Sequence, residues 1–438
     1  MSENKMENEN VLNAAVDKAV SYEDAVFIAV ELGEHIMRSG GEISRAEDTV
    51  SRICKAYGAV TADVTAIMSV IVVTADFGGV SINTSRRITE IGSHNLGRLS
   101  RLNNLSRQIC RELPSKEEVL KRLDHIDDES CVSWSVSLIG AILASAGFAV
   151  FFGGSWIDAI FSGLIAIPMA FILRWLSNTK MNNVIAKFIV CFIGGILAIL
   201  VSKTGVTCNV DKIMIGNIMN VIPGVLLTNS FRDLFSGDIM SGFFRMCTAV
   251  LDAIAIAFGY AVAILAFGGV TYAEGFAWGV SVPWEVAIIL IASTVGTMGI
   301  ILQFGIEKRV ILLALLSSLL CCAAYEISFR LGCGFFVSSL IASAVAAAYS
   351  DFMAHMVKVP ATVMIIPAIV PLVPGGRLYY TMLGAVREDI SRFYENGKVA
   401  LMVAAGLALG IIAVTAISRP VNAKIAEFNY KKAQKRQK

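Results

Sequence analysis

The residues best suited to chemistry in this sequence are polar or helix-breaking ones inside strongly apolar segments. Pro223-Gly224 and Pro374-Gly375 each interrupt such a segment. A proline there removes a backbone hydrogen bond, and a neighbouring glycine loosens the helix further. Two such breaks that meet near the membrane midplane would bind a polar substrate through the freed backbone groups; a simple packing kink is the alternative. The candidate substrate-binding residues are Asn217, Asn220, Pro223, Gly224, Thr228, Asn229, Pro371, Pro374 and Gly375.

A carboxylate, Asp252, lies well inside another apolar segment, between Ala-Val-Leu and Ala-Ile-Ala. A charge at that depth costs a few kcal/mol on insertion scales unless it is paired or protonated. Asp252 is therefore the candidate for ion or proton coupling. Pairing with Arg232 or Arg245, or exposure to a water-filled vestibule, are the alternatives.

A group of arginines is the third candidate feature. We predict that these side chains form a basic funnel for an anionic or zwitterionic substrate at the cytoplasmic mouth. A solvated face, or contact with lipid headgroups, is the alternative. The residues are Arg86, Arg87, Arg98, Arg101 and Arg232.

Other chemistry finds little support in the sequence. There is no P-loop, no GxSxG and no HExxH motif, so ATP hydrolysis, serine hydrolysis and zinc proteolysis by this chain are not expected. The four histidines and nine cysteines are scattered, without metal-ligand spacing. We therefore expect that the protein is not an enzyme and that it has no catalytic residues, no bound metal and no cofactor.

The elements that position these residues fall into two parts. Residues 1–130 hold 15 Lys+Arg and 21 Asp+Glu, whereas the rest of the chain holds 22 and 14. We predict a flexible N-terminus over 1–20 and an α+β domain over 21–130, with a sheet of about three strands in the β-branched stretch 59–88. The first 20 residues lack the apolar core of a signal peptide, which favours a cytoplasmic domain.

The remainder reads as membrane-embedded. Ten apolar stretches approach the ~20 residues that a bilayer requires, and a spanning backbone must be helical to satisfy its own hydrogen bonds. The predicted spans are 133–152, 156–174, 184–202, 210–228, 243–268, 284–304, 309–329, 333–350, 360–380 and 398–418.

These spans show an internal repeat. Pro223-Gly224 and Pro374-Gly375 lie 151 residues apart, and the same offset carries the first five spans onto the last five. We predict five helices in 131–280, five in 281–420 and a basic cytoplasmic tail over 421–438. Because each repeat has an odd number of spans, the second is inverted in the membrane, as in many secondary transporters.

The distribution of charge sets an orientation. Basic residues between spans fall mainly on the side of the N-terminus, and the end of the chain is strongly basic, which places both termini in the cytoplasm. The loop 381–397 is the exception, because Arg387 and Arg392 then lie outside. Either this loop folds back among the helices or the last two spans are placed wrongly.

Three segments of the chain resemble the threonine/serine exporter family: Gly40-Gly-Glu-Ile-Ser-Arg-Ala-Glu-Asp-Thr-Val-Ser-Arg-Ile-Cys-Lys-Ala-Tyr-Gly58, Asn95–Arg107, and Ile222-Pro-Gly-Val-Leu-Leu-Thr-Asn-Ser-Phe-Arg-Asp233 with Gly237-Asp238. Residues 281–418 resemble the small subunit of the split form of the family, which is associated with succinate. The resemblance implies a cytoplasmic domain followed by ten spans, and efflux of threonine and serine driven by the proton-motive force.

The sequence therefore favours an inverted-repeat, polytopic α-helical membrane protein that exports small polar metabolites, such as threonine and serine, across the cytoplasmic membrane. Dicarboxylate export, a passive channel, and a membrane-anchored sensor or enzyme that uses the N-terminal domain remain alternatives. The expected partners are the small-molecule substrate and the lipid bilayer, and no nucleic acid. Assembly into a homo-oligomer is a further possibility.

Overall fold

The computed structural model describes residues 20–88, 95–129, 132–179, 181–206, 208–267 and 282–436. Their contacts divide the chain into two compact units, Met1–Cys131 and Val132–Lys438. The division falls where the density of charged residues drops in the sequence. All but residue 20 of the predicted lead-in 1–20 lies outside the described residues.

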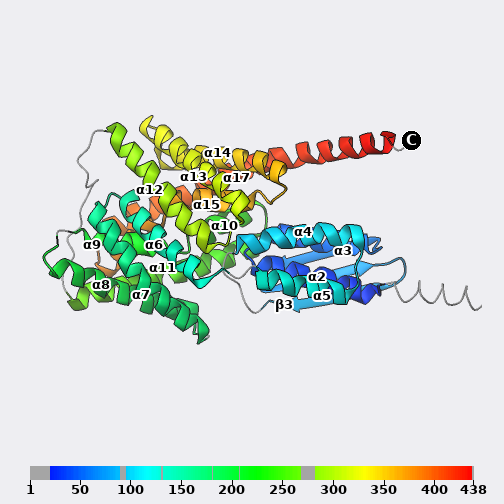
Figure 1. Ribbon diagram of the computed structural model, residues 1–438, viewed down its shortest axis with the longest axis horizontal. Coiled ribbons are helices and arrows are strands. Elements are labelled where there is room, and N and C mark those ends of the chain that lie inside the picture. The colour runs from blue at the N-terminus through cyan, green and yellow to red at the C-terminus, as the bar shows by residue number, and fades with distance from the viewer. Residues whose placement is uncertain are drawn as a thin grey trace, which may run out of the picture. The chain divides into compact units, whose positions relative to one another are not determined.

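The N-terminal unit is built on a three-stranded antiparallel sheet of order β1-β2-β3. Side chains alternate between the two faces of the middle strand, so Ile71, Val73 and Ala75 are buried on one face. Helices α2 and α3 pack on the sheet, and α4 and α5 pack on those helices (Figure 1). The elements are α2 (Tyr22–Arg38), α3 (Ile43–Ala56), β1 (Thr61–Ile67), β2 (Val70–Asp76), β3 (Ser81–Arg87), α4 (Leu96–Glu112) and α5 (Lys116–Glu129).

Among its described residues, the second unit contains helices and no strands. Its elements are α6 (Trp134–Phe151), α7 (Trp156–Asn178), α8 (Asn183–Lys203), α9 (Val210–Ile218), α10 (Gly224–Phe235), α11 (Ile239–Phe267), α12 (Val282–Gln303), α13 (Lys308–Arg330), α14 (Gly334–Val357), α15 (Thr362–Ile369), the 3₁₀ turn η1 (Val370–Leu372), α16 (Gly375–Val386) and α17 (Ile390–Arg436).

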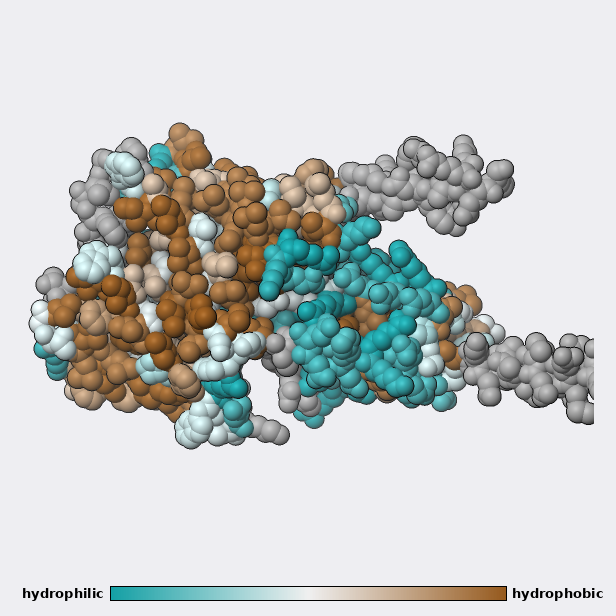
Figure 2. Space-filling model, in the orientation of Figure 1, coloured by the Kyte–Doolittle hydropathy of each residue, from teal (hydrophilic) through white to brown (hydrophobic). Residues whose placement is uncertain are grey.

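The long helices of this unit are suited to a bilayer. Among the described residues, eight helices are long and apolar enough to cross it, and α15 with α16 adds a ninth if that pair, bent by 45°, counts as one span. Apolar side chains such as Ile139, Leu164, Phe171 and Leu312 are exposed, and Figure 2 shows the apolar residues that cover the face in view. Such a surface requires lipid around it. The protein is therefore an α-helical polytopic membrane protein.

Two predicted regions differ from the structure. The predicted span 210–228 is divided into α9 and α10, each too short to cross a bilayer, because the chain stops being helical before Pro223. The predicted loop 381–397 is wrong: α16 continues to Val386 and α17 begins at Ile390. Charged residues lower the hydropathy of this stretch. Arg387, Glu388 and Asp389 connect the two helices, and Arg392 and Glu395 lie in the first turns of α17. That helix continues over most of the predicted tail 421–438.

We call α6–α11 the first half of this unit and α12–α17 the second half. The packing inside one half recurs in the other: α8 packs on α11 as α14 packs on α17, and α10 on α11 as α16 on α17. The contacts between halves are reciprocal too, with α10 on α17 and α16 on α11. Three pairs of helices begin 151 residues apart, at Asn183 and Gly334, Gly224 and Gly375, and Ile239 and Ile390.

The two halves meet along α6 and α12. A Cβ atom on Gly147 would lie 2.4 Å from the backbone nitrogen of Gly296, and one on Gly299 would lie 2.4 Å from the carbonyl oxygen of Gly140. Small residues of this kind allow two membrane helices to approach closely. The crossing therefore depends on glycine in both helices.

Candidate functional site

Both predicted helix breaks are present, and they have the same local geometry. Pro223 precedes α10 with φ −81° and ψ 36°, and Pro374 precedes α16 with φ −74° and ψ 46°. The breaks also touch, because a Cβ atom on Gly375 would lie 2.8 Å from Ile222 Cδ1 and 3.1 Å from Met219 Sδ. Two short helices thus start from adjoining points inside the bundle.

Polar side chains cluster at the end of α9, beside the first break. The Asn217 side chain accepts a hydrogen bond from Ser145 (3.1 Å) and donates to Ser162 (3.2 Å). Asn220 donates to Ser145 Oγ at 2.6 Å and accepts from Gln303 Nε2 at 3.0 Å. The network joins α6, α7 and α9 of the first half to α12 of the second half.

A cavity of about 240 Å³ opens beside this network. Its polar lining consists of amide, hydroxyl and guanidinium groups, and its other walls are apolar. Arg174 at the rim is exposed, and its guanidinium lies 4.5 Å from the ring centroid of Trp134. Such a mixture of apolar walls and a few convergent polar groups is typical of a small-molecule site. The polar lining residues are Ser137, Arg174, Ser177, Asn217, Asn220 and Gln303.

The structure separates the other predicted binding residues from this cavity. Thr228 and Asn229 are buried on α10, and the Thr228 hydroxyl has no hydrogen-bond partner among the described residues. Pro371 is buried in η1. Of the nine predicted residues, Asn217 and Asn220 line the cavity, while Pro223 and Pro374 shape the two breaks. No role of these residues in binding is tested by the structure, so each role stays a prediction.

Asp252 is buried on α11, with 1% of its side chain exposed, and it pairs with Lys187 of α8 at 2.5 Å. Neither of the predicted partners is the one found: Arg245 instead contacts Asp233 at 2.9 Å. Oδ1 of Asp252 is buried without a hydrogen-bond partner among the described residues. One oxygen of the buried aspartate is therefore ion-paired and the other is unsatisfied. The helices of the pair, α8 and α11, both belong to the first half.

The predicted basic funnel is divided in the structure. Arg86 is paired with Glu31 and Glu34, at 2.9 and 2.8 Å. Its neighbour Arg87 is exposed and, by the alternation of a strand, points to the opposite face of the sheet. Ion pairs also engage Arg98 with Asp127 at 2.6 Å and Arg101 with Glu129 at 2.9 Å, while Arg232 lies on α10 of the other unit.

The Arg86 pair belongs to a charged cluster inside the N-terminal unit. A hydrogen bond with His35 lowers the pKa of the Glu31 carboxyl, and the charge of Arg86 adds to the effect, against the opposing influence of burial. Nη2 of Arg98 lies 2.8 Å from Nδ1 of the same histidine. The cluster joins α2, β3 and α4, so its first effect is to hold that unit together.

The sequence reading did not place several residues at the site. Arg174 and Gln303 lie at or near the ends of the predicted spans 156–174 and 284–304, and the sequence gives neither a role, but both line the cavity. Lys187 and Asp211 were passed over, although each is a charged residue inside a predicted span. A search for every charge within a span, rather than the most deeply placed one, would have found both.

The bundle, its two paired breaks and the polar cavity define a polytopic membrane transport protein. Comparison with known families agrees. One family model, described as "Putative threonine/serine exporter", matches residues 27–267, and a second, "Threonine/Serine exporter, ThrE", matches 289–417. The chain belongs to the threonine/serine exporter family. The two matches divide the membrane unit between α11 and α12, where its halves divide.

Relatives occur in bacteria and in yeasts. A "Threonine/serine exporter" of Corynebacterium glutamicum is 22% identical over 420 residues, which cover 88% of this chain and 80% of the relative. "Pheromone-regulated membrane protein 10" of Kluyveromyces lactis is 24% identical over 364 residues, covering 75% of this chain but 37% of the relative. No solved structure gives a significant match to the chain.

Proposed function

We propose that the protein is a secondary active exporter of small polar metabolites of the threonine and serine type, driven by the proton-motive force across the cytoplasmic membrane. The observation that carries the proposal is the cavity at the broken helix α9, where Asn217, Asn220 and Gln303 supply hydrogen-bonding groups. Arg174 at its rim would attract the carboxylate of such a substrate. The family of the chain supports export.

The proposal includes an inverted repeat of five and five helices. The reciprocal packing of the two halves and the shared spacing of their helices support it. α9 with α10, and α15 with α16, would then be equivalent broken spans, giving ten in all. Rocking of one half against the other would expose the cavity to each side in turn.

The orientation follows from charge. Lys308 and Arg309 begin α13 and follow closely on Gln303, and Arg174 lies near the end of α7. If these basic residues mark the cytoplasmic side, the cavity faces the cytoplasm, where an exporter collects its substrate. Both termini and the N-terminal α+β domain would lie on the same side.

Asp252 with Lys187 is the proposed coupling pair. Protonation of a buried aspartate leaves its lysine partner uncompensated, so the proton would change the energy of the surrounding helices. A passive channel would not need such a pair. The alternative substrate is a dicarboxylate such as succinate, for which a guanidinium at the rim is equally suited.

Efflux from proteoliposomes tests the proposal. Vesicles loaded with labelled serine, threonine or succinate are compared with and without an imposed proton gradient. We expect gradient-dependent efflux of at least one of them, lost in Asn220→Ala and retained in Asn396→Ala, a matched variant on α17. Equal efflux with and without the gradient would instead indicate a channel. If none of the three substrates moves, in a preparation shown to be folded, a sensor role of the N-terminal unit becomes the better hypothesis.

A further inference from the structure

A buried carboxylate that the proposed site does not use lies at the other end of the membrane unit. Asp211 is the second residue of α9, and its side chain is fully buried. Asn209, two residues before it, donates its backbone N–H to Asp158 in the first turn of α7 at 2.7 Å. Arg174 lies 16 residues further along that helix, about 24 Å at 1.5 Å per residue. Asp211 and the cavity rim are thus at opposite ends of α7.

The partner of Asp211 comes from the other half. The Tyr380 hydroxyl on α16 donates a hydrogen bond to Asp211 Oδ2 at 2.5 Å. Oδ1 of the same carboxylate is buried and has no hydrogen-bond partner among the described residues. This bond connects the start of the first broken helix to the middle of the second short helix. A motion that separates the two halves at this end has to break it.

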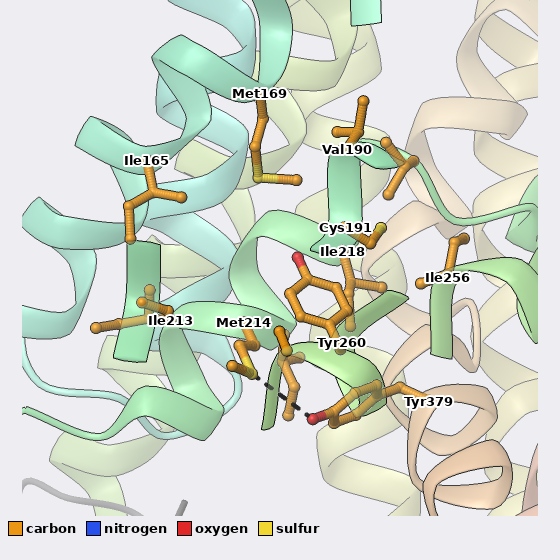
Figure 3. Packing of buried hydrophobic residues seen from close by; sticks show 14 of the residues in the cluster. Ile165, Met169, Val190, Cys191, Ile213, Met214, Ile218, Ile256, Tyr260 and Tyr379 are labelled. Carbon is orange, nitrogen blue, oxygen red and sulfur yellow. Dashed lines mark hydrogen bonds between the residues drawn. The ribbon is translucent and has the colours of Figure 1, made fainter. Parts of the chain in front are cut away.

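The residue beside it in sequence is anchored more firmly. Tyr379 is buried in a cluster of first-half side chains, where its ring centroid lies 6.0 Å from that of Tyr260. Figure 3 shows its hydroxyl directed at Met214 of α9, at 3.9 Å from the sulfur. Apolar packing therefore places α16 against α9 and brings the Tyr380 hydroxyl to the carboxylate.

The charges around Asp211 come from several elements. Lys212 on its own helix acts on it, as do Arg387 after α16 and Arg392 on α17. Asp158 of α7 accepts hydrogen bonds from the backbone N–H groups of Ser155 and Asn209. Helix α6 carries no charged residue, and α8 carries Lys187 and Lys203, of which Lys187 pairs with Asp252. Of these groups, Tyr380 of the second half donates a hydrogen bond to the Asp211 carboxylate.

We propose that Asp211 and Tyr380 form a latch that closes the pathway at the end opposite the cavity, and that a proton taken up by Asp211 from that side releases it. The hydroxyl keeps its own proton throughout, and the incoming proton binds the carboxylate. A hydrogen bond to a carboxylate is roughly twice as strong as one to a neutral acid, so protonation weakens the latch. The proposal rests on the proposed function, in which that end faces the acidic side of the membrane.

Thiol labelling at this end tests the latch without a transport assay. Cys208 is free, partly buried and three residues from Asp211. A variant that keeps Cys208 as its one cysteine is labelled in proteoliposomes with a membrane-impermeant maleimide between pH 5.5 and 7.5. A second variant that keeps the exposed Cys333 gives the intrinsic pH dependence of the reaction, and its rates normalise the first.

We expect normalised labelling of Cys208 to accelerate as the pH falls. Tyr380→Phe should label about tenfold faster at pH 7.5, the shift that loss of a hydrogen bond to a charged group can produce. Asp211→Asn should be fast and independent of pH. Tyr394→Phe, an exposed tyrosine on α17, should behave as the parent, and thermal unfolding checks that all variants fold.

Two results would overturn the latch: Cys208 labelling that is unchanged in Tyr380→Phe at every pH, or a pH dependence that survives in Asp211→Asn. Acid-accelerated labelling in a protein that moves none of the tested metabolites would support the latch while the proposed export fails. If Cys208 labelling does not accelerate in acid while efflux is intact, the proposed export stands and the latch is wrong.

Discussion

The two halves of the membrane unit differ in the polar groups that they bury. Among the described residues, the buried charged side chains of this unit all lie in the first half, and the buried polar side chains of the second half are serines and threonines. The helices nevertheless pack in corresponding pairs. The charged set is Asp158, Asp211, Lys212, Asp233, Arg245 and Asp252.

A duplicated scaffold therefore does not require duplicated chemistry. A membrane helix packs through small residues and tolerates hydroxyl groups that bond back to their own helix. A buried charge is costly and persists where it has a function or a partner. Among the described residues, the second half buries hydroxyl groups where the first half buries charges, and it contributes Gln303 to the polar network of the cavity. Its broken helix, Thr362–Val386, is apolar before its break.

The largest effect on stability is expected for the Lys187–Asp252 pair, which has no charged counterpart at the equivalent positions of the second half. Positions 151 residues after Asp252 and Lys187 hold Val403 and Ser338, both buried. Asp252→Asn leaves the lysine ammonium uncompensated and should lower the free energy of unfolding by about 3–5 kcal/mol. Chemical unfolding in detergent measures this loss.

The double variant Lys187→Ser/Asp252→Val copies the residues of the second half and should recover most of that stability. It separates folding from coupling, because a stable double variant that has lost gradient dependence assigns coupling to the pair. Gradient-dependent efflux that persists in the double variant would remove the coupling role from Asp252.

The shared scaffold predicts equal effects at two equivalent glycines. A Cβ atom on Gly259 would lie 2.5 Å from the carbonyl oxygen of Phe188, and one on Gly410 would lie 2.3 Å from that of Leu340. Overpacking typically costs 1–3 kcal/mol, so Gly259→Ala and Gly410→Ala should each lower stability by about that amount. Thermal midpoints that fall in one variant and not in the other would show that the halves pack differently.

Removing an amide from the polar network should cost a similar amount of stability and cause a larger loss of function. Asn217→Ala removes the side-chain hydrogen bonds to Ser145, Ser162 and the Ile213 carbonyl. Hydrogen bonds within membrane proteins average about 0.6 kcal/mol each, so we expect a loss of about 2 kcal/mol. Efflux should disappear, because the lost amide also lines the cavity. A variant with unaltered efflux would move the binding site elsewhere.

The breaks could be predicted from the sequence because they are local. Proline and glycine at Pro223-Gly224 and Pro374-Gly375 act on their own helix, whatever packs around them. The partner of Asp252 could not, since Lys187 is 65 residues away and only the packing of α8 on α11 selects it over Arg245. Charges also hid the start of α17, because a hydropathy window ends a span where a charged helix begins.

The smallest effect is expected for a hydroxyl pair of the second half. Ser317 and Ser350 are hydrogen-bonded at 2.9 Å between α13 and α14, and both are fully buried. The position 151 residues before Ser317 is Ala166, so Ser317→Ala copies the first half at a site away from the cavity network. We expect a loss of about 0.6 kcal/mol in unfolding free energy and efflux equal to that of the parent. If efflux falls while the protein stays folded, the buried serines of the second half take part in transport, and their assignment to packing alone is wrong.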